Sequence, residues 1–204
     1  MSTWLITGCS SGLGRALAGA VVEAGHSAVV TARDEATVAD LVELAPERVL
    51  GAALDVTDPA RAAVVVQQAE DRFGAVDVLV NNAGYGYRAA VEEGEDADVR
   101  ALFETHFFGS VTMIKAVLPG MRARRAGAIV NVSSIGAHIK PPGSGYYAAV
   151  KAALEGMSGS LRDELQPLGI SGDDRRARRI PHGLLRSVAD PVPNRDRRLR
   201  GDGG

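Results

Sequence analysis

A glycine-rich turn near the amino terminus constrains the fold of this chain more than any other feature. An apolar run at residues 4–6 leads into residues 7–14 (Thr-Gly-Cys-Ser-Ser-Gly-Leu-Gly), and an Ala/Leu/Val-rich helical stretch follows. Glycines at three positions permit a tight turn, and they let backbone N–H groups approach a phosphate at the positive end of the helix dipole. The sequence therefore predicts a strand, a turn and a helix that together bind a dinucleotide.

The first 170 residues alternate between short apolar runs and helical stretches. The runs at 4–7, 28–32, 49–54, 76–81 and 128–133 suit buried parallel strands, and helical stretches fall near 12–24, 35–44, 59–73, 96–124 and 144–168. This spacing is typical of βαβ units. We expect an α/β fold with a Rossmann-type, doubly wound parallel sheet in a single domain, since 46% hydrophobic content can supply one core.

A phenol and an amine lie one helical turn apart at Tyr147 and Lys151, downstream of Ser133 and Ser134. Residues at i and i+4 share a helix face. An ammonium beside a phenol favours the phenolate, so such a pair could exchange protons near neutral pH. A hydroxyl such as that of Ser134 would steady a substrate oxygen during hydride transfer. Taken alone, the Tyr and Lys are also compatible with an ordinary helix.

Four blocks together resemble the short-chain dehydrogenase/reductase family, in its Tyr-x-x-x-Lys branch. They are the glycine turn at 7–14, residues 54–58 (Leu-Asp-Val-Thr-Asp), residues 81–84 (Asn-Asn-Ala-Gly), and Ser134 followed by Tyr147 and Lys151. The resemblance runs from about residue 3 to about residue 170. It implies that Tyr147 is the general acid/base, that Ser134 orients the carbonyl or alcohol, and that Lys151 serves both Tyr147 and the nicotinamide ribose.

His106 stands where the family usually carries Asn. In the family, that Asn lies in a helix and helps to hold a water that connects the active-site lysine to solvent. Imidazole can also hold a water, and it titrates near neutrality. His106 is therefore either a catalytic residue that keeps the relay with a new pH dependence or a side chain that fills the space.

The resemblance also implies a dinucleotide site, with residues 82–84 against the adenosine ribose and residues 55–56 at the adenine. A plain strand-ending turn is the alternative for residues 81–84. The implied cofactor residues are Gly8, Ser10, Ser11, Gly12, Leu13, Gly14, Arg33, Asp55, Val56, Asn82, Ala83, Gly84, Tyr147 and Lys151.

Residues at the end of the second predicted strand indicate which cofactor is used. A carboxylate on the last strand residue would bind the ribose 2′-OH of NAD, but Ala32 stands there and Asp34 falls two places late. Arg33 could pair with a 2′-phosphate and stack on adenine. NADP is therefore favoured over NAD, although Ser11 occupies the place where some NADP enzymes of the family carry a basic residue.

Composition indicates the cellular compartment and the kinds of partner to expect. Cys9 is the only cysteine, so no intrachain disulfide can form and a reducing compartment is expected. The apolar runs are too short to span a bilayer and the amino terminus lacks the basic start of a signal peptide, so we expect a cytoplasmic protein without a membrane partner or a metal. The resemblance implies a small carbonyl or alcohol substrate, and a homodimer or homotetramer if the carboxyl-terminal region is intact.

Residues 171–204 differ sharply from the rest. They hold nine of the 23 Lys plus Arg residues, all Arg, and no aromatic residue. Such a segment favours disorder, and without aromatic side chains to stack bases it does not favour nucleic-acid binding. Codons for residues 172–184 can be chosen so that reading one base later gives Val-Thr-Ile-Val-Glu-Pro-Gly-Ala-Phe-Arg-Thr-Asp-Phe. The family places such a strand and Pro-Gly turn there, so a frameshift near Ser171 is our leading hypothesis.

The sequence therefore predicts an NADP-dependent oxidoreductase that interconverts an alcohol and a ketone or aldehyde. With an aberrant tail, we expect the chain to lack the sixth strand and the segment that closes over substrate, and to be poorly stable and weakly active. A non-catalytic dinucleotide-binding or scaffold protein is the alternative. Residues 85–88 and 135–145 are expected to line a pocket for a hydrophobic carbonyl compound.

Overall fold

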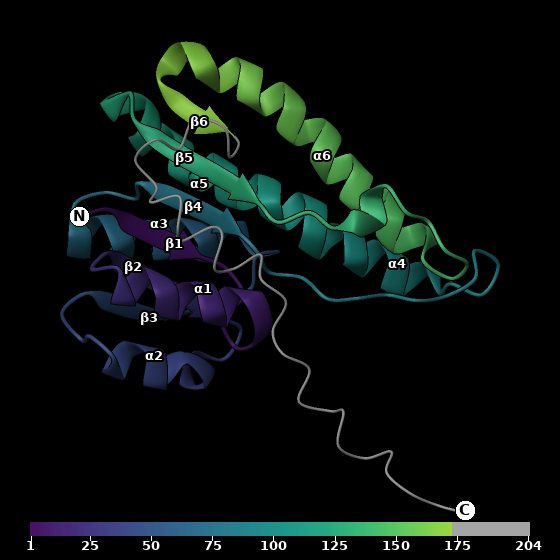
Figure 1. Cartoon of the computed structure of the whole chain (residues 1–204), viewed down its shortest axis with the longest axis horizontal. Helices are drawn as coiled ribbons and strands as arrows, with labels where there is room; N and C mark the ends of the chain where they lie inside the picture. Colours follow the sequence, from purple (N-terminus) through teal and green to yellow (C-terminus); the bar gives the residue numbers. More distant parts are fainter. Residues whose placement is uncertain (173–204) are drawn as a thin grey trace, which may run out of the picture.

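The predicted parallel sheet is present and holds six strands in the order β3-β2-β1-β4-β5-β6 (Figure 1). The computed structural model describes residues 1–172. Strands β1 (Thr3–Ile6) and β4 (Val78–Asn81) form the centre, β2 (Ser27–Ala32) and β3 (Val49–Ala53) extend one side, and β5 (Gly127–Asn131) and β6 (Ile170–Gly172) extend the other. All pairings are parallel, as the Rossmann-type prediction required.

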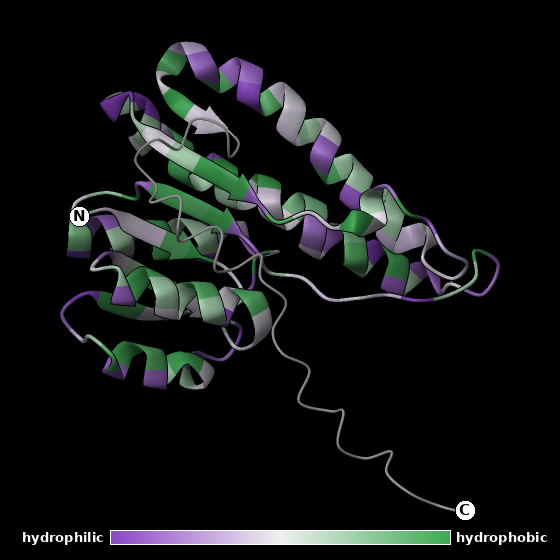
Figure 2. Cartoon of the chain, viewed as in Figure 1, coloured by the Kyte–Doolittle hydropathy of each residue, from purple (hydrophilic) through white to green (hydrophobic). Residues whose placement is uncertain are grey.

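Helices cover both faces of the sheet because alternate strand residues point to opposite sides. Leu5 and Val29 pack with α3 (Pro59–Phe73), α5 (Gly109–Arg124) and the end of α6 (Gly145–Leu165), whereas Trp4 and Ile6 pack with α1 (Gly12–Glu23) and α2 (Ala39–Glu43). The ribbon coloured by hydropathy shows the result, with apolar strands inside and helices that are apolar on one side only (Figure 2). None of the helices in residues 1–172 has both the length and the apolar content needed to cross a bilayer.

Two predicted helices are interrupted. The stretch expected to be one helix at 96–124 consists of α4 (Asp96–Phe103), a π-helical turn η2 (Glu104–Phe108) and α5. Ser110 donates a hydrogen bond from Oγ to the His106 carbonyl at 2.9 Å within this turn. At Gly109, a Cβ would lie 2.6 Å from Val56 Cγ2, so the backbone approaches the sheet closely there. The stretch expected at 35–44 begins as a 3-10 helix, η1 (Glu35–Val38), and continues as α2.

The expectation that the chain lacks a sixth strand is wrong. Strand β6 is short, but it pairs with β5 in parallel register, from Gly127 opposite Ile170 to Ile129 opposite Gly172. A 3-10 turn, η4 (Gln166–Leu168), and Gly169 with a positive φ of 76° turn the chain from α6 into this strand. The disorder prediction covers residues 171–204 and is wrong for Ser171 and Gly172, which lie in β6; residues 173–204 lie outside the described residues. The frameshift near Ser171 stays a prediction.

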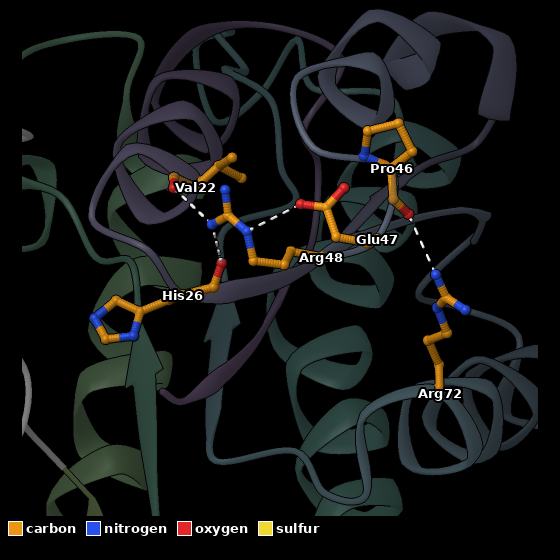
Figure 3. Close-up of polar contacts among 6 residues, drawn as sticks. All are labelled: Val22, His26, Pro46, Glu47, Arg48 and Arg72. Atoms are coloured by element: carbon orange, nitrogen blue, oxygen red, sulfur yellow. Dashed lines mark hydrogen bonds and ion pairs between the residues drawn. The ribbon is translucent and has the colours of Figure 1, made fainter.

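Arginine side chains tie the loops together at the amino-terminal edge of the sheet (Figure 3). Arg48 donates hydrogen bonds to the carbonyl oxygens of Val22 and His26 at 3.0 and 3.3 Å. Arg48, just before β3, thereby ties the end of α1 and the loop before β2 together. Arg72 from α3 donates to the Pro46 carbonyl at 3.3 Å. These contacts lie at the edge of the sheet opposite the carboxyl ends of the strands.

Candidate active site

A cleft of about 1050 Å³ lies at the carboxyl-terminal edge of the sheet, where ligands bind in open α/β sheets. It brings together almost every residue that the sequence singled out. These are Gly8, Ser10, Ser11, Gly12, Leu13, Arg33, Asp55, Val56, Asn82, Ala83, Gly84, His106, Ser134, Tyr147 and Lys151. Gly14 is the exception among the predicted site residues, because it is buried beneath the turn and does not line the cleft.

The glycine turn fits a pyrophosphate. Gly8 and Gly12 have positive φ values of 72° and 59°, which only glycine adopts without strain. Helix α1 begins without a side-chain cap from Ser11 and without an acidic residue in its first turn, so its open N–H groups and positive dipole end can receive an anion. At Gly14, a Cβ would overlap the Gly8 carbonyl and the Asn82 amide, so this glycine lets α1 close against the turn.

Asn82 braces the glycine turn from the end of β4. Its Nδ2 donates to the carbonyl oxygens of Thr7 at 2.9 Å and Gly8 at 3.1 Å. In return, Thr7 Oγ1 accepts the backbone N–H groups of Asn82 at 3.0 Å and Ala83 at 2.9 Å. These four hydrogen bonds make residues 81–84 more than a turn that ends a strand, because they fix two loops that lie far apart in the sequence.

The end of the cleft beside β2 and β3 has a distinct charge arrangement. Ala32 and Arg33 line the cleft, whereas the Asp34 carboxylate accepts the Ala36 N–H at 3.0 Å and caps η1. Asp55 Oδ1 accepts the N–H of Thr57 at 2.9 Å and its hydroxyl at 2.7 Å. These two hydrogen bonds, with a smaller contribution from the Arg33 charge, lower the pKa of Asp55 and keep it ionised.

Ser134, Tyr147 and Lys151 converge at the end of β5. Ser134 caps the 3-10 turn η3 (Ile135–Ala137), where its Oγ accepts the Gly136 N–H at 3.0 Å. A Cβ on Gly136 would lie 3.2 Å from Ser134 Oγ and 3.3 Å from Tyr147 Cδ1, so the Ser134 and Tyr147 side chains flank this glycine. Lys151 Nζ donates to the Val132 carbonyl at 2.7 Å and lies 5.8 Å from the Tyr147 ring centroid. Burial lowers the pKa of Lys151 to about 8.

His106 sits in the π-helical turn with its ring against Gly84, where any Cβ would overlap the imidazole. Its Nε2 lies 3.0 Å from the Tyr85 backbone nitrogen and 2.9 Å from the Tyr85 carbonyl oxygen. Burial, and then the Lys151 charge, lower the pKa of His106 to about 4. This lowered pKa contradicts the expectation that the imidazole titrates near neutrality. Within residues 1–172, its Nδ1 is buried without a hydrogen-bond partner.

Sequence reasoning missed residues that act through side-chain hydrogen bonds. Ser133 Oγ donates to Glu155 Oε1 at 2.5 Å. Asn131 at the end of β5 accepts from Asn81 Nδ2 at 2.9 Å and donates to Ser158 Oγ at 2.8 Å, which links β4, β5 and α6. Glu155 follows Lys151 by one helical turn, and that spacing was the available signal.

Of the residues expected to line a substrate pocket, 85–88 and 135–145, only Tyr85 and Gly86 line this cleft. The loops that carry the others contact each other beside it. The Ala89 N–H donates to the Gly143 carbonyl at 3.0 Å, and the Tyr146 hydroxyl donates to the Val91 carbonyl at 2.5 Å. Large apolar side chains are exposed along these loops, namely Tyr85, Val91, Ile135 and Ile139. The loops are thus joined to each other and present an apolar surface.

Cys9 lies in the glycine turn but is not an available nucleophile. It is fully buried, its Sγ donates to the Ile6 carbonyl at 3.2 Å, and burial raises the pKa of its thiol to about 12. A thiol of this kind is a small core side chain. No group of three or more His, Cys, Asp or Glu residues gathers as a metal site in the part of the chain that the structure describes.

Known proteins resemble this chain in sequence and fold. The family model for short chain dehydrogenases matches residues 2–172. An oxidoreductase of Botryotinia fuckeliana, BOA17, is 42% identical over 168 residues, which cover 82% of this chain and 61% of that protein. A 3-ketodihydrosphingosine reductase of Bacteroides thetaiotaomicron is 40% identical over 166 residues, which cover 81% of this chain and 59% of that protein.

The solved structure of a short-chain dehydrogenase from Streptomyces avermitilis matches with a TM-score of 0.80 and 46% identity. The match covers 83% of this chain and 62% of that one. This chain therefore spans about six-tenths of the length of these proteins.

Proposed function

This chain belongs to the short chain dehydrogenase family, and from this premise we propose that it is an NADP-dependent oxidoreductase that interconverts an alcohol and a ketone or aldehyde by hydride transfer. One observation carries the proposal. The glycine turn and the three reactive side chains of Ser134, Tyr147 and Lys151 line the same cleft. A dinucleotide held by the turn would therefore lie in the same space as a substrate held by the serine and the tyrosine.

A bound nicotinamide cofactor supplies or accepts the hydride at the reacting carbon. Tyr147 is the general acid in reduction, giving its phenolic proton to the substrate oxygen, and the general base in oxidation. Ser134 Oγ accepts from Gly136 N–H, which leaves its own O–H free to donate to the same substrate oxygen. Lys151 is held by Val132 through one of its three donors. Its positive charge stabilises the phenolate that forms when Tyr147 has given up its proton.

We propose NADP over NAD from the contacts around Arg33. This guanidinium lines the cleft beside β2 and can pair with a 2′-phosphate. The nearby Asp34 carboxylate, which would repel that phosphate, is turned into the cap of η1. Asp55 stays close to Arg33 but is held by Thr57. In this proposal Arg33 is therefore the side chain that contacts the 2′-phosphate of NADP.

The substrate in this proposal is a small hydrophobic carbonyl compound or the matching alcohol. The exposed apolar side chains of Tyr85, Ile135 and Ile139 lie on the loops that flank the reactive groups. Burying them against an apolar substrate would contribute to binding, at about 25 cal/mol per Å² of apolar surface removed from water. We also propose a cytoplasmic location, which rests on the composition, and assembly as a homodimer or homotetramer if the carboxyl-terminal region is intact, which rests on the family resemblance.

The proposal is tested with Tyr147→Phe. NADPH and NADH binding is measured by fluorescence titration, and turnover by NADPH oxidation with 4-nitrobenzaldehyde, an activated aldehyde that demands little of the pocket. We expect wild type to bind NADPH more tightly, and Tyr147→Phe to lose about 100-fold or more in turnover with NADPH affinity unchanged.

Tyr146→Phe is the matched control, since it removes the neighbouring hydroxyl and its hydrogen bond to the Val91 carbonyl. We expect it to keep most of its turnover. Equal turnover in wild type and Tyr147→Phe would instead favour a non-catalytic dinucleotide-binding protein.

A further inference from the structure

Glu155 extends the row of functional side chains on α6. It follows Tyr147 and Lys151 at successive intervals of four residues, so all three lie on one face of the helix. Tyr147 and Lys151 line the cleft, whereas Glu155 does not. Its carboxylate instead reaches the segment that carries Ser134.

The two carboxylate oxygens of Glu155 contact residues on both sides of Ser134. Oε1 accepts the hydroxyl of Ser133 at 2.5 Å, and Oε2 lies 3.2 Å from Nε2 of His138. Ser134 and His138 are the residues that cap the two ends of η3. One carboxylate from the helix with Tyr147 therefore contacts the chain just before η3 and at its end.

The two contacts differ in strength. The Ser133 bond is a short, charge-assisted hydrogen bond between half-buried groups. The His138 side chain is 67% exposed, and an ion pair in such a position contributes little. The Ser133 contact is therefore expected to supply most of the constraint.

This constraint acts on the distance between the two reactive groups. Ser134 Oγ and the Tyr147 ring flank Gly136, and their approach is set by how η3 lies on α6. Apart from its contact with Gly136, the Ser134 side chain has no hydrogen bond in the described region that would fix it to α6. Two hydrogen bonds join the chain beside it to α6, from Lys151 to the Val132 carbonyl and from Ser133 to Glu155, and the Ser133 bond is the nearer in sequence.

We infer that Glu155 is a positioning residue that holds Ser134 in place relative to Tyr147 by accepting the hydroxyl of Ser133. The inference rests on the proposed function for its effect on catalysis. The effect of Glu155 on the order of residues 133–138 does not depend on that function. Catalysis and the order of this segment can be measured separately.

The test compares Glu155→Ala, Ser133→Ala and the double variant with wild type. Each single variant is expected to lower kcat about 10- to 100-fold, because a small misplacement of a reactive group is enough for such a loss. NADPH affinity should be unchanged. The double variant should be no worse than either single one, since both remove the same bond. Glu155→Gln can still accept from Ser133, so it should recover much of the activity.

The matched control is Glu164→Ala. Glu164 also lies on α6 and also accepts a serine hydroxyl, from Ser160 at 2.9 Å, but this pair is exposed and does not line the cleft. Hydrogen exchange of residues 133–138 supplies a readout that needs no turnover. We expect faster exchange of this segment in Glu155→Ala and no change in Glu164→Ala.

Unchanged exchange in Glu155→Ala would overturn the inference, and so would unchanged kcat despite faster exchange. Additive losses in the double variant would also overturn it. Failure of the proposed function looks different. In that case wild type and Tyr147→Phe turn over 4-nitrobenzaldehyde equally, and the positioning role falls with the reaction even if exchange shows that the contact exists.

Discussion

The two sides of the cleft are built by different means. On the α1 side, the glycine turn is held by close backbone approach and by the exchange of hydrogen bonds between Thr7 and Asn82. On the α6 side, side-chain hydrogen bonds join the helix to the segment that follows β5. Lys151 donates to the Val132 carbonyl, and Glu155 accepts from Ser133. We therefore expect added side-chain volume to disrupt the α1 side, whereas on the α6 side a substitution can remove a single hydrogen bond.

The sheet shows the same difference in burial. Every residue of β1 and β2 is buried, whereas in β5 only Ile129 is fully buried. Ala128, Val130 and Val132 point to the face that α1 covers farther along the sheet, and they are only partly buried. In the region that the structure describes, the α1 side of the cleft thus rests on a closed core and the α6 side on a more open one.

The largest expected effect comes from Gly14→Ala, which disrupts the close packing of α1 against the glycine turn. The added Cβ would overlap the Gly8 carbonyl, and backbone cannot rotate away as a side chain can. We expect a loss of about 3 kcal/mol or more in the free energy of unfolding, together with loss of NADPH binding. Gly19→Ala on the same helix is the control, because nothing lies within 4 Å of its Cβ position. It should stabilise α1 by about 0.5–1 kcal/mol. Normal NADPH affinity in Gly14→Ala would contradict the comparison.

Lys151→Met tests the catalytic side through pH. Burial lowers the pKa of Lys151 from its ordinary 10.5 to about 8, so between these values the unfolded chain binds a proton that the folded chain does not. Stability contributed by this group therefore rises with pH across that window, by at most on the order of 3 kcal/mol. Denaturant unfolding of wild type relative to Lys151→Met should show the rise. The exposed Lys115→Met should track wild type. A flat difference from pH 8 to 10.5 would contradict a buried ammonium.

Arg33→Ala sharpens the assignment of NADP to the α1 side. Removing a charge-assisted contact with a 2′-phosphate should weaken NADPH binding by about 10- to 100-fold, and NADH binding should change little. Arg88→Ala, an exposed arginine that does not line the cleft, should bind both as wild type does. Fluorescence titration measures the NADPH and NADH affinities of wild type and of both variants. A parallel loss of NADH affinity would mean that Arg33 contributes to folding or to the adenine site and not to the choice of cofactor.

His106→Asn should have the smallest effect at neutral pH. Because the pKa of His106 is about 4, its ionisation cannot shape the pH dependence of kcat between pH 6 and 8. The profiles of wild type and His106→Asn should have the same form there. In acid, wild type should lose stability as the pH falls from 6.5 towards 4, since the unfolded imidazole binds a proton first. An inflection near neutrality that the substitution removes would restore the titrating-relay hypothesis.

Local sequence patterns predicted the parts of this molecule that depend on neighbours in the chain. The apolar runs placed β1 to β5 correctly, and the strand, turn and helix around Gly8 and Gly12 followed from glycine spacing. The spacing of Tyr147 and Lys151 placed both on one helix face, and both line the cleft with Ser134. Their chemical roles remain predictions.

Features that depend on contacts between distant segments could not be predicted in this way. The π-helical turn at 104–108 interrupts an otherwise helical pattern, and Gly109 after it lies against Val56 from a distant segment. The lowered pKa of His106 depends on burial and on Lys151. Strand β6 is too short to have an apolar period, and it forms because Gly169 turns the chain back to β5. Ser133 could not be paired with Glu155 before the two elements were placed.

The π-helical turn at Glu104–Phe108 fixes the length of the chain at that point. A helix rotates by about 100° for each residue, and a π turn takes up one residue more than an α turn does. Leu102 before the turn and Met113 after it are both fully buried, so the turn at its present length leaves both helices with an apolar side chain in the core. Removing or adding one residue would turn one apolar face towards solvent. Substitutions in the turn should therefore be tolerated better than an insertion or a deletion of one residue there.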